Sequence, residues 1–258
     1  MNTQGPDKID WTDATINPVV GCTHGCDYCY ARRQAKRRKH SCSLCYDFIP
    51  HPHLERLNKL NSRQKPKKIF IDSMWDWNCK DNQLYWMHTI LAKIRKCKQH
   101  TFQILSKFPQ GYKNYDFPEN VWIGGTIDTQ ARSNSILNSL KEANASVKFI
   151  SFEPLLENLD VDLQGINWII IGADSRIGAN KPPMEWADNL IMQAKKLNIP
   201  VFVKENYKYK DRLKAFPEIL KFFWHCIKPE KMEGTIFPKD SKPSRILLNY
   251  AEELANIE

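Results

Sequence analysis

Short apolar segments recur along the chain, and each is followed by a longer stretch with one apolar and one polar face. The apolar segments are rich in β-branched residues and almost continuously hydrophobic, which is typical of strands buried on both faces of a parallel sheet. They span residues 16–21, 68–74, 101–107, 121–127, 147–154, 168–174 and 200–206. The alternation predicts βα units joined by right-handed crossovers.

The clearest helical patterns lie in residues 82–97 and 184–198. In the first of them, apolar residues fall on one helix face, namely Leu84, Met87, Ile90, Leu91 and Ile94. Six to seven strand–helix units predict an α/β fold, a partial (β/α) barrel of the TIM type, and a doubly wound open sheet is the alternative. The barrel is expected over residues 1–206, and a small helical extension over residues 207–258.

Polar residues stand where the predicted strands end. In a (β/α) barrel the chemistry takes place at the carboxyl ends of the strands, so these residues are expected to line a pocket. They are Asp72 and Ser73, Ser106 and Lys107, Thr126 and Asp128, Ser151 and Glu153, Asp174 and Ser175, and Lys204 and Glu205. For each of them, an ordinary hydrogen bond or salt bridge at the rim is the alternative role.

The composition sets the class of protein. A chain of 258 residues with 42% hydrophobic residues and eight Trp can bury a sizeable core. It has no apolar run long enough to span a membrane and no apolar segment of a signal peptide near its start, so we expect a cytoplasmic protein. In that reducing compartment the eight cysteines are expected to be metal ligands or buried thiols rather than disulfides.

The net charge of +9 is unevenly distributed. Residues 1–70 contain 13 Lys and Arg against 6 Asp and Glu, so this part carries 13 − 6 = +7. The densest basic run is residues 32–40. Such a run favours nucleic acid or a nucleotide as substrate or partner, and a solvated helix face is the alternative.

Three cysteines, Cys22, Cys26 and Cys29, form a C-x3-C-x2-C pattern directly after the first predicted strand. Thiolates are soft ligands that suit zinc and iron–sulfur clusters. A four-iron cluster held by three cysteines leaves one iron open to a chelator from outside the protein. The pattern therefore predicts a [4Fe–4S] cluster at the functional end of the barrel.

A different pairing of the cysteines is the main alternative. The C-x2-C knuckle of Cys26 and Cys29 is followed, after 12 residues, by a second knuckle of Cys42 and Cys45. Four thiolates at this spacing could bind one zinc ion, with the basic run between the knuckles. The function would then be that of a non-catalytic zinc-ribbon nucleic-acid-binding protein, in which Cys22 has no role.

The cysteine segment resembles the signature of the radical S-adenosylmethionine (SAM) superfamily. Residues 22–29 read CTHGCDYC, and an aromatic residue, here Tyr28, commonly precedes the third cysteine in that superfamily. Over roughly residues 9–206 the chain also resembles the phage-associated domain-of-unknown-function family 5131, which is counted among radical-SAM-like proteins. This second resemblance is carried by IDWTDATINPVVGCTHGCDYCYARR, PHLERL, KKIFIDSMWDW, QHTFQILSKFPQGY, NVWIGGTIDTQAR, VKFISFEPLL, WIIIGADS and IPVFVKEN.

The resemblance implies a mechanism and a set of site residues. SAM would bind the open iron and, after reduction by a flavodoxin- or ferredoxin-like protein, release a 5′-deoxyadenosyl radical that abstracts a hydrogen atom from the substrate. The residues expected to line the SAM pocket are Tyr28, Ser73, Lys107, Thr126, Glu153, Asp174 and Lys204. No catalytic residue is assigned. A cluster-bearing partner or regulatory protein without SAM chemistry is a third hypothesis.

Cys42 and Cys45 have a separate interpretation beside two histidines. With His51 and His53, or with His40, they could form a structural zinc site, or they could hold an auxiliary iron–sulfur cluster. Two surface thiols near a proline turn are the alternative. The isolated cysteines are expected to be ordinary buried thiols; they are Cys79, Cys97 and Cys226.

Overall fold

The computed structural model describes residues 1–258 with the exception of residues 6–7, 38–41, 80–82 and 218–258. The chain divides into two units, Met1–Pro217 and Glu218–Glu258. The predicted helical extension therefore lies outside the described residues from residue 218 onward. All the helices and strands that the structure describes belong to the first unit.

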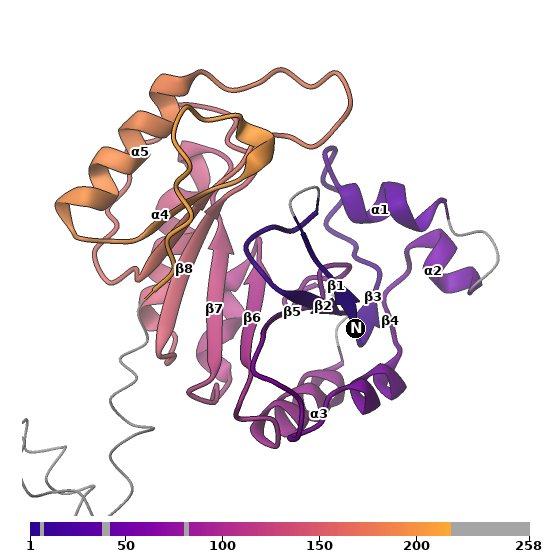
Figure 1. Ribbon diagram of the computed structural model, residues 1–258. Coiled ribbons are helices and arrows are strands. Elements are labelled where there is room, and N and C mark those ends of the chain that lie inside the picture. Colours follow the sequence, from indigo (N-terminus) through magenta and orange to yellow (C-terminus); the bar gives the residue numbers. More distant parts are fainter. Residues whose placement is uncertain (6–7, 38–41, 80–82, 218–258) are drawn as a thin grey trace, which may run out of the picture. The chain divides into compact units, whose positions relative to one another are not determined.

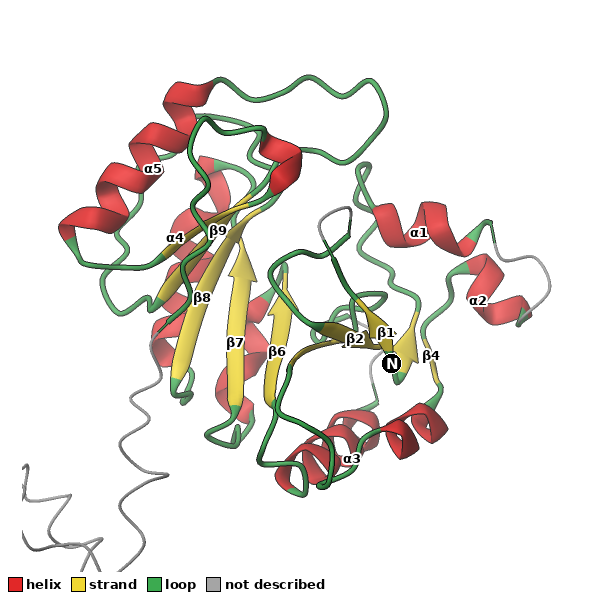
Figure 2. Ribbon diagram, in the orientation of Figure 1, coloured by secondary structure: helices red, strands yellow, loops and turns green. Residues whose placement is uncertain are grey.

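An eight-stranded sheet is the framework of this unit, with the strand order β1-β2-β5-β6-β7-β8-β9-β10 (Figure 1). The strands are β1 (Asn2–Thr3), β2 (Ala14–Ile16), β5 (Lys68–Ile71), β6 (Thr101–Ser106), β7 (Val121–Thr126), β8 (Val147–Phe152), β9 (Trp168–Ile171) and β10 (Val201–Val203). Only β1 is antiparallel to its neighbour, so 8 − 1 = 7 of these strands are parallel. The sheet curls like half a barrel (Figure 2), and within the described residues no pairing of β10 with β1 closes it. The mixed α/β class is confirmed, whereas the predicted partial barrel of the TIM type with six to seven strands is not: the sheet has eight strands and is mostly parallel.

The first predicted strand, residues 16–21, is divided in the structure. Its beginning belongs to β2 of the large sheet, whereas Val19 and Val20 form β3 (Val19–Val20), which pairs antiparallel with β4 (His51–Pro52) in a separate two-stranded sheet. Pro18 stands at the division, and because proline has no backbone N–H it cannot continue the ladder of a central strand. The chain thus leaves the large sheet just before the cysteine segment.

Helices cover one face of the sheet. They are α3 (Leu84–Arg95), α4 (Gln130–Glu142) and α5 (Met184–Lys196), while the shorter α1 (Tyr30–Ala35) and α2 (Ser43–Asp47) lie beside the β3–β4 pair (Figure 1). Short 3₁₀ helices span Leu54–Lys59, Pro109–Asn114 and Glu205–Tyr207. The predicted apolar face of α3 is confirmed except for Leu84, which is 64% exposed; it occupies the first helical position, and Trp86 is buried instead. No helix in the described part of the chain has the length and hydrophobicity needed to cross a membrane.

The two faces of the sheet explain its continuous hydrophobicity. Side chains on one face, such as Ile69 and Ile71, pack in the core that includes the helices, whereas the intervening Phe70 belongs to a second cluster on the opposite face. This second cluster consists of Trp11, Phe70, Trp122, Val147, Phe149, Trp168, Ile170 and Phe202. Because bulky side chains fill this inner face, polar chemistry is confined to the carboxyl edge of the sheet.

The helix predicted to follow residue 206 does not form in residues 208–217. Instead the segment returns to the edge strand β10: the Val203 amide donates to the Leu213 carbonyl, and the Ala215 amide donates to the Val201 carbonyl. An edge strand offers unpaired backbone groups, and these residues use them in place of helical hydrogen bonds.

Candidate functional site

The cysteine loop, residues 21–29, lies over the carboxyl edge of the large sheet. Its first amide, on Gly21, donates to the carbonyl of Met74 at 3.0 Å, and the hydroxyl of Tyr30 donates to the carbonyl of Ser73 at 2.6 Å. Near its end, the Tyr28 hydroxyl donates to the carboxylate of Asp128. Ser73 and Met74 follow β5 and Asp128 follows β7, with β6 between these two strands in the sheet. The loop therefore spans the ends of three successive parallel strands, the edge at which such folds carry their active sites.

The three loop cysteines have different surroundings. Cys29 caps α1, and its sulfur accepts a hydrogen bond from the Arg32 amide at 3.4 Å. Burial raises the pKa of Cys26, and the nearby Cys29 thiol adds to this effect while Lys107 opposes it. Cys22 instead faces Cys79: a hydrogen bond with that thiol, together with burial, raises the pKa of Cys22. All three cysteines are partly exposed residues.

Cys79 is more than the ordinary buried thiol that we predicted. It is only 1% exposed, but its sulfur accepts a hydrogen bond from the Thr23 amide at 3.3 Å and lies 3.0 Å from the Thr23 hydroxyl. A fourth thiol therefore stands beneath the beginning of the cysteine loop. Cys97 is a buried core residue as predicted, and Cys226 lies outside the described residues.

Asp76 connects the cysteine loop to the sheet. Its carboxylate accepts hydrogen bonds from the Ser106 hydroxyl at 2.6 Å and from the Lys107 amide at 2.8 Å, and it lies 3.5 Å from Nε2 of His24. Burial opposes ionisation, but His24 and the hydrogen bonds keep the pKa of Asp76 below its usual value. Asp76 was not among the predicted pocket residues, because Ser106 and Lys107 stand at the end of a different strand and His24 belongs to the loop.

Tyr28 and Lys107, two of the predicted pocket residues, come together at the ends of β6 and β7. The Lys107 ammonium lies 4.7 Å from the centre of the Tyr28 ring and 4.0 Å from the carboxylate of Asp128. Arg132 donates to both oxygens of the same carboxylate, at 2.9 and 3.0 Å. Burial lowers the pKa of Lys107, although Asp128 opposes this effect. Arg132 was missed; it lies in the first turn of α4, four residues after Asp128, which precedes the helix.

Glu153 and Lys204 form a second ionic group, at the ends of β8 and β10. Their charged side chains are in direct contact. Gly172, which follows β9, leaves room for the pair, because a Cβ atom there would lie only 3.0 Å from Lys204 Cδ and 3.1 Å from Glu153 Cγ. Both lysines of the predicted SAM pocket, Lys107 and Lys204, therefore already lie beside a carboxylate.

The other three residues of the predicted SAM pocket join neither ionic group; they are Ser73, Thr126 and Asp174. The hydroxyl of Ser73 donates to the Asn17 side chain at 3.1 Å, and Thr126 is buried in β7. The carboxylate of Asp174 forms a salt bridge of 2.6 Å with Arg176, two residues further along the chain. The contacts of Ser73 and Asp174 are also those of ordinary rim residues, and a role in a SAM pocket stays a prediction for all three residues.

A possible metal site lies beside the cysteine loop, at the β3–β4 pair. The potential ligand atoms of four residues all lie within 4.8 Å of one another, and these residues are Cys42, Cys45, His51 and His53. Cys42 precedes α2, Cys45 lies in it, His51 is in β4, and His53 follows that strand. The prediction that these residues could hold a metal ion is thus confirmed. Among the described residues, this group does not include Cys26 or Cys29.

The group has short internal distances. Nε2 of His51 lies 3.5 Å from the Cys42 sulfur and 3.4 Å from the Cys45 sulfur, and Nε2 of His53 lies 3.2 Å from the Cys45 sulfur. The two Nε2 atoms are 2.9 Å apart. All four side chains therefore converge through the atoms that bind metals.

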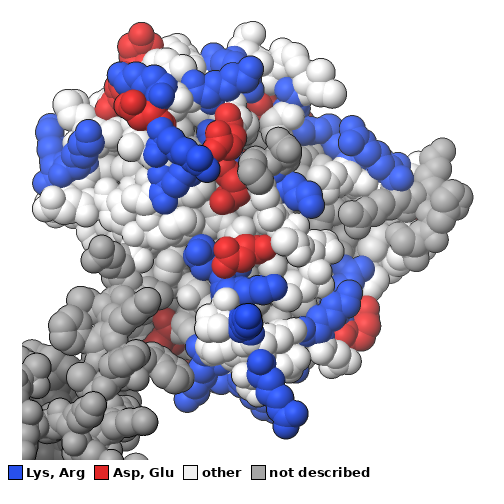
Figure 3. Space-filling view, viewed as in Figure 1, with Lys and Arg blue, Asp and Glu red and all other residues white. Residues whose placement is uncertain are grey.

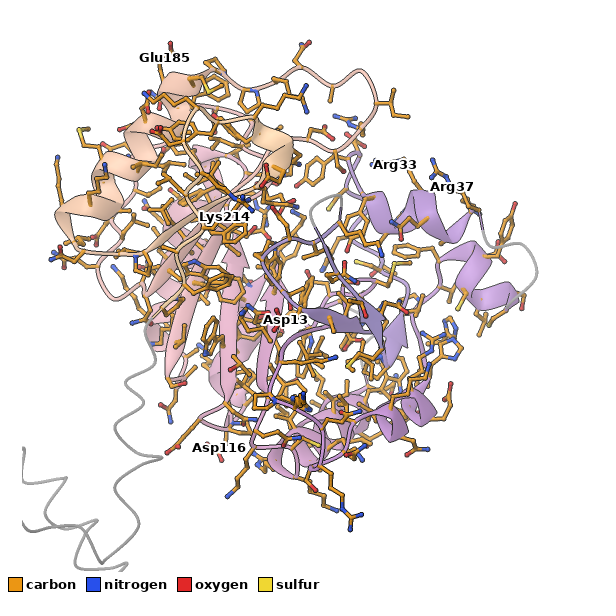
Figure 4. The ribbon with its side chains drawn as sticks, in the orientation of Figure 1. Asp13, Arg33, Arg37, Asp116, Glu185 and Lys214 are labelled. Carbon is orange, nitrogen blue, oxygen red and sulfur yellow. The ribbon has the colours of Figure 1, made fainter. Side chains whose placement is uncertain are left out.

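The basic run has local structural roles where it is described. Arg32 donates to the carbonyl of Cys22 and Arg33 to that of Tyr28, both at 3.1 Å, so these residues brace the loop. Figure 4 shows Arg33 and Arg37 at α1 and just beyond it. On the face drawn in Figure 3, Lys and Arg are spread widely and alternate with Asp and Glu. Binding of nucleic acid stays a prediction.

Comparison with known proteins yields a family but no function. The chain matches the model of a family described as a protein of unknown function (DUF5131) over residues 6–234. Among curated proteins and solved structures, nothing matches. The match confirms the family part of the resemblance seen in the sequence, and the radical SAM part stays a prediction.

Proposed function

Because the chain belongs to the DUF5131 family, whose description states no function, we propose its activity from its own residues: it is a radical SAM enzyme. The observation that carries the proposal is the position of the C-x3-C-x2-C loop, which is hydrogen-bonded to the segments that follow β5 and β7. In parallel α/β sheets, cofactors bind at this edge.

The loop has the donors that a [4Fe–4S] cluster needs. Cys22, Cys26 and Cys29 are soft ligands on one short segment, and each is partly exposed. Each thiolate of such a cluster binds a different iron atom, so the three sulfurs do not have to converge on one point as the ligands of a single ion do. When bound, the cluster and SAM would supply a 5′-deoxyadenosyl radical that removes a hydrogen atom from the substrate.

The surrounding residues would bind and orient these groups. Lys204 is a buried cation and Lys107 is a half-buried one, and each could exchange its carboxylate partner for an anionic group of SAM or substrate. Asp76 holds the loop through His24. The aromatic cluster fills the inner face of the sheet and would keep water away from below.

The net charge and the second group of cysteines bear on the substrate, the electron donor and the second metal of the proposed enzyme. We propose a nucleic acid or nucleotide substrate, supported by the positive charge of residues 1–70, and a flavodoxin- or ferredoxin-like protein as electron donor in the cytoplasm. The metal at Cys42 and Cys45 would be zinc or an auxiliary cluster. The zinc-ribbon alternative is less well supported, because Cys42 and Cys45 converge with two histidines rather than with Cys26 and Cys29.

Anaerobic reconstitution with iron and sulfide tests the activity. We expect the absorbance and electron paramagnetic resonance signals of a four-iron cluster, a change of the resonance when SAM is added, and formation of 5′-deoxyadenosine after reduction. The triple variant C22A/C26A/C29A should lose all three signals. The variant Cys97→Ala, which removes a buried thiol of the core, should keep them. An absence of iron uptake, or a cluster whose resonance ignores SAM, would refute the proposal.

A further inference from the structure

We propose that Cys42, Cys45, His51 and His53 bind one zinc ion in a closed site, and that this ion holds the beginning of the cysteine loop in place. The zinc site does not depend on the proposed activity, since none of these residues belongs to the cysteine loop. The proposal goes beyond a site that could hold some metal: the ion is zinc, and the bound ion positions Cys22.

The distances fit a tetrahedral ion. With Zn–N bonds of about 2.0 Å and Zn–S bonds of about 2.3 Å, tetrahedral ligand atoms lie roughly 3.3–3.8 Å apart. The sulfur–nitrogen distances of 3.2, 3.4 and 3.5 Å are close to that range. The nitrogen–nitrogen distance of 2.9 Å is shorter, and a bound ion would push the two rings slightly apart.

The hydrogen bonds on the far side of both rings point to a cation between them. Nδ1 of His51 lies 2.7 Å from the Ile49 carbonyl oxygen, which can only accept, so Nδ1 carries the proton. Nδ1 of His53 lies 3.3 Å from the Glu55 carboxylate, which favours the same tautomer. Both Nε2 atoms then present lone pairs toward each other at 2.9 Å. Metal-bound histidines are oriented in this way by carbonyl and carboxylate acceptors.

The donor set selects zinc among common ions. Two thiolates and two imidazoles in a tetrahedral arrangement suit zinc, whereas magnesium and calcium prefer oxygen ligands. The Glu55 carboxylate contacts the outer nitrogen of His53 and not the centre of the group. With four protein ligands no coordination position is left for a substrate, so the role of the ion is structural.

The surrounding elements are too short to be stable alone. Helix α2 has five residues and buries none of them, and β3 and β4 have two residues each. Helices and strand pairs of this length are marginal in water, and a metal ion that joins them contributes its binding free energy to their folding. The ion would join α2, β4 and the start of the following 3₁₀ helix.

The same elements hold the beginning of the cysteine loop. His51 pairs with Val20, two residues before Cys22, and the Cys22 amide donates to the Phe48 carbonyl at 3.2 Å. Gly21 adopts φ +99° and approaches so closely that a Cβ atom would lie 2.3 Å from the Ile49 carbonyl. The segment between Cys45 and His51 is therefore the support on which Cys22 rests, and both ends of that segment are zinc ligands.

Metal analysis of the purified full-length protein tests the site. We expect about one zinc per chain in the native protein and in C22A/C26A/C29A, and a loss of zinc in Cys45→Ser and His53→Ala. The variant His53→Cys, which supplies another thiolate, should retain it and guards against the effect of misfolding. Replacement by Co²⁺ should produce the visible absorption bands of a tetrahedral ion. Iron in place of zinc, no metal, or zinc lost only from C22A/C26A/C29A would overturn the proposal.

Thiol alkylation followed by mass spectrometry tests the role of the ion. Removal of zinc by a chelator, or by His53→Ala, should increase the alkylation rate of Cys22 at least about tenfold, while buried Cys97 stays protected. Restoring zinc to the chelated protein should return Cys22 to its slow rate. An alkylation rate of Cys22 that is the same with and without zinc would overturn the positioning role. Because the probe needs neither iron nor SAM, its outcome is separate from that of the reconstitution.

Discussion

The two cysteine-containing regions of this protein differ in how their sulfurs are arranged. At the β3–β4 pair, two thiols and two imidazoles converge, and both imidazoles are oriented from behind by oxygen acceptors. In the cysteine loop, by contrast, Cys22 faces Cys79 while Cys29 caps a helix. Convergence is what a single closed ion requires, whereas separate sulfurs on an exposed loop suit a larger group with room for a ligand from outside.

The cysteine loop is held in place from two sides. The loop is held on one side by the segment that carries the metal ligands, through the Phe48 carbonyl and the close approach of Ile49. On the other side it is held by the carboxyl edge of the large sheet, directly through Asp76 and His24, and indirectly through Asp72, which binds Val19 in the preceding strand β3. Variants that weaken one support at a time can rank them.

The largest effect is expected from loss of the metal ligands. In His53→Ala, backbone amides of residues 42–57 should exchange hydrogen about 100-fold faster than in the native protein, because roughly 3 kcal/mol of metal-dependent stability would be lost locally. Amides of β7 and β8, deep in the large sheet, serve as the internal control and should keep their rates. Hydrogen exchange read by mass spectrometry resolves the two regions. Equal protection of residues 42–57 in both proteins would mean that the elements do not depend on an ion.

Gly21→Ala should be the next most damaging change. An added Cβ atom would meet the carbonyl carbon and oxygen of Ile49 at 2.3 Å, in a backbone conformation with φ +99° that side chains rarely adopt. We expect a loss of about 3 kcal/mol of unfolding free energy in urea. Gly25→Ala is a matched control, because Gly25 also has a positive φ, of +72°, but has open space around it; about 1 kcal/mol is expected. Equal losses would show that contact with Ile49 does not matter.

Asp76→Asn should weaken the support from the sheet by about 2 kcal/mol, since the amide cannot accept all the hydrogen bonds that the buried carboxylate accepts. The folded-state pKa of Asp76 is lowered, so its contribution is present above the unfolded pKa of about 3.9 and is lost as the pH falls through the folded value. Native protein and variant should therefore converge in stability in acid. Urea titrations at several pH values measure this. Exposed Asp116→Asn, the control, should change stability by less than about 0.5 kcal/mol.

How much of this could be predicted from the sequence depends on the distance over which each feature acts. The parallel strands were predictable because burial on both faces leaves a continuous apolar pattern, and the Cys42–His53 group was predictable because its ligands are close along the chain. The roles of Cys79 and Asp76 were not, because the partners that define these roles are brought near only by folding: Thr23 lies 56 positions from Cys79, and Ser106 lies 30 positions from Asp76. Strand β1 was missed because its two residues are polar and exposed.

Asp72→Asn is expected to change the unfolding free energy least, and in the opposite direction from Asp76→Asn. It lies at φ 59°, a conformation that Asn also tolerates, and its Oδ1 accepts a hydrogen bond from the Val19 amide at 2.9 Å. An amide oxygen in Asp72→Asn can accept the same bond, so the position of β3 should be unchanged.

Burial raises the pKa of Asp72 well above its usual value. Such a group contributes stability that is fully present below the unfolded pKa of about 3.9 and is lost as the pH rises through the folded value. Asp72→Asn removes this loss, so the variant should be more stable than the native protein near pH 7, by about 1 kcal/mol, and the advantage should vanish in acid. Urea titrations of both proteins near pH 7 and in acid measure the two differences in unfolding free energy. If the variant is instead less stable at pH 7, the prediction is wrong. The ionised carboxylate of Asp72 would then stabilise β3, and through β3 the cysteine loop.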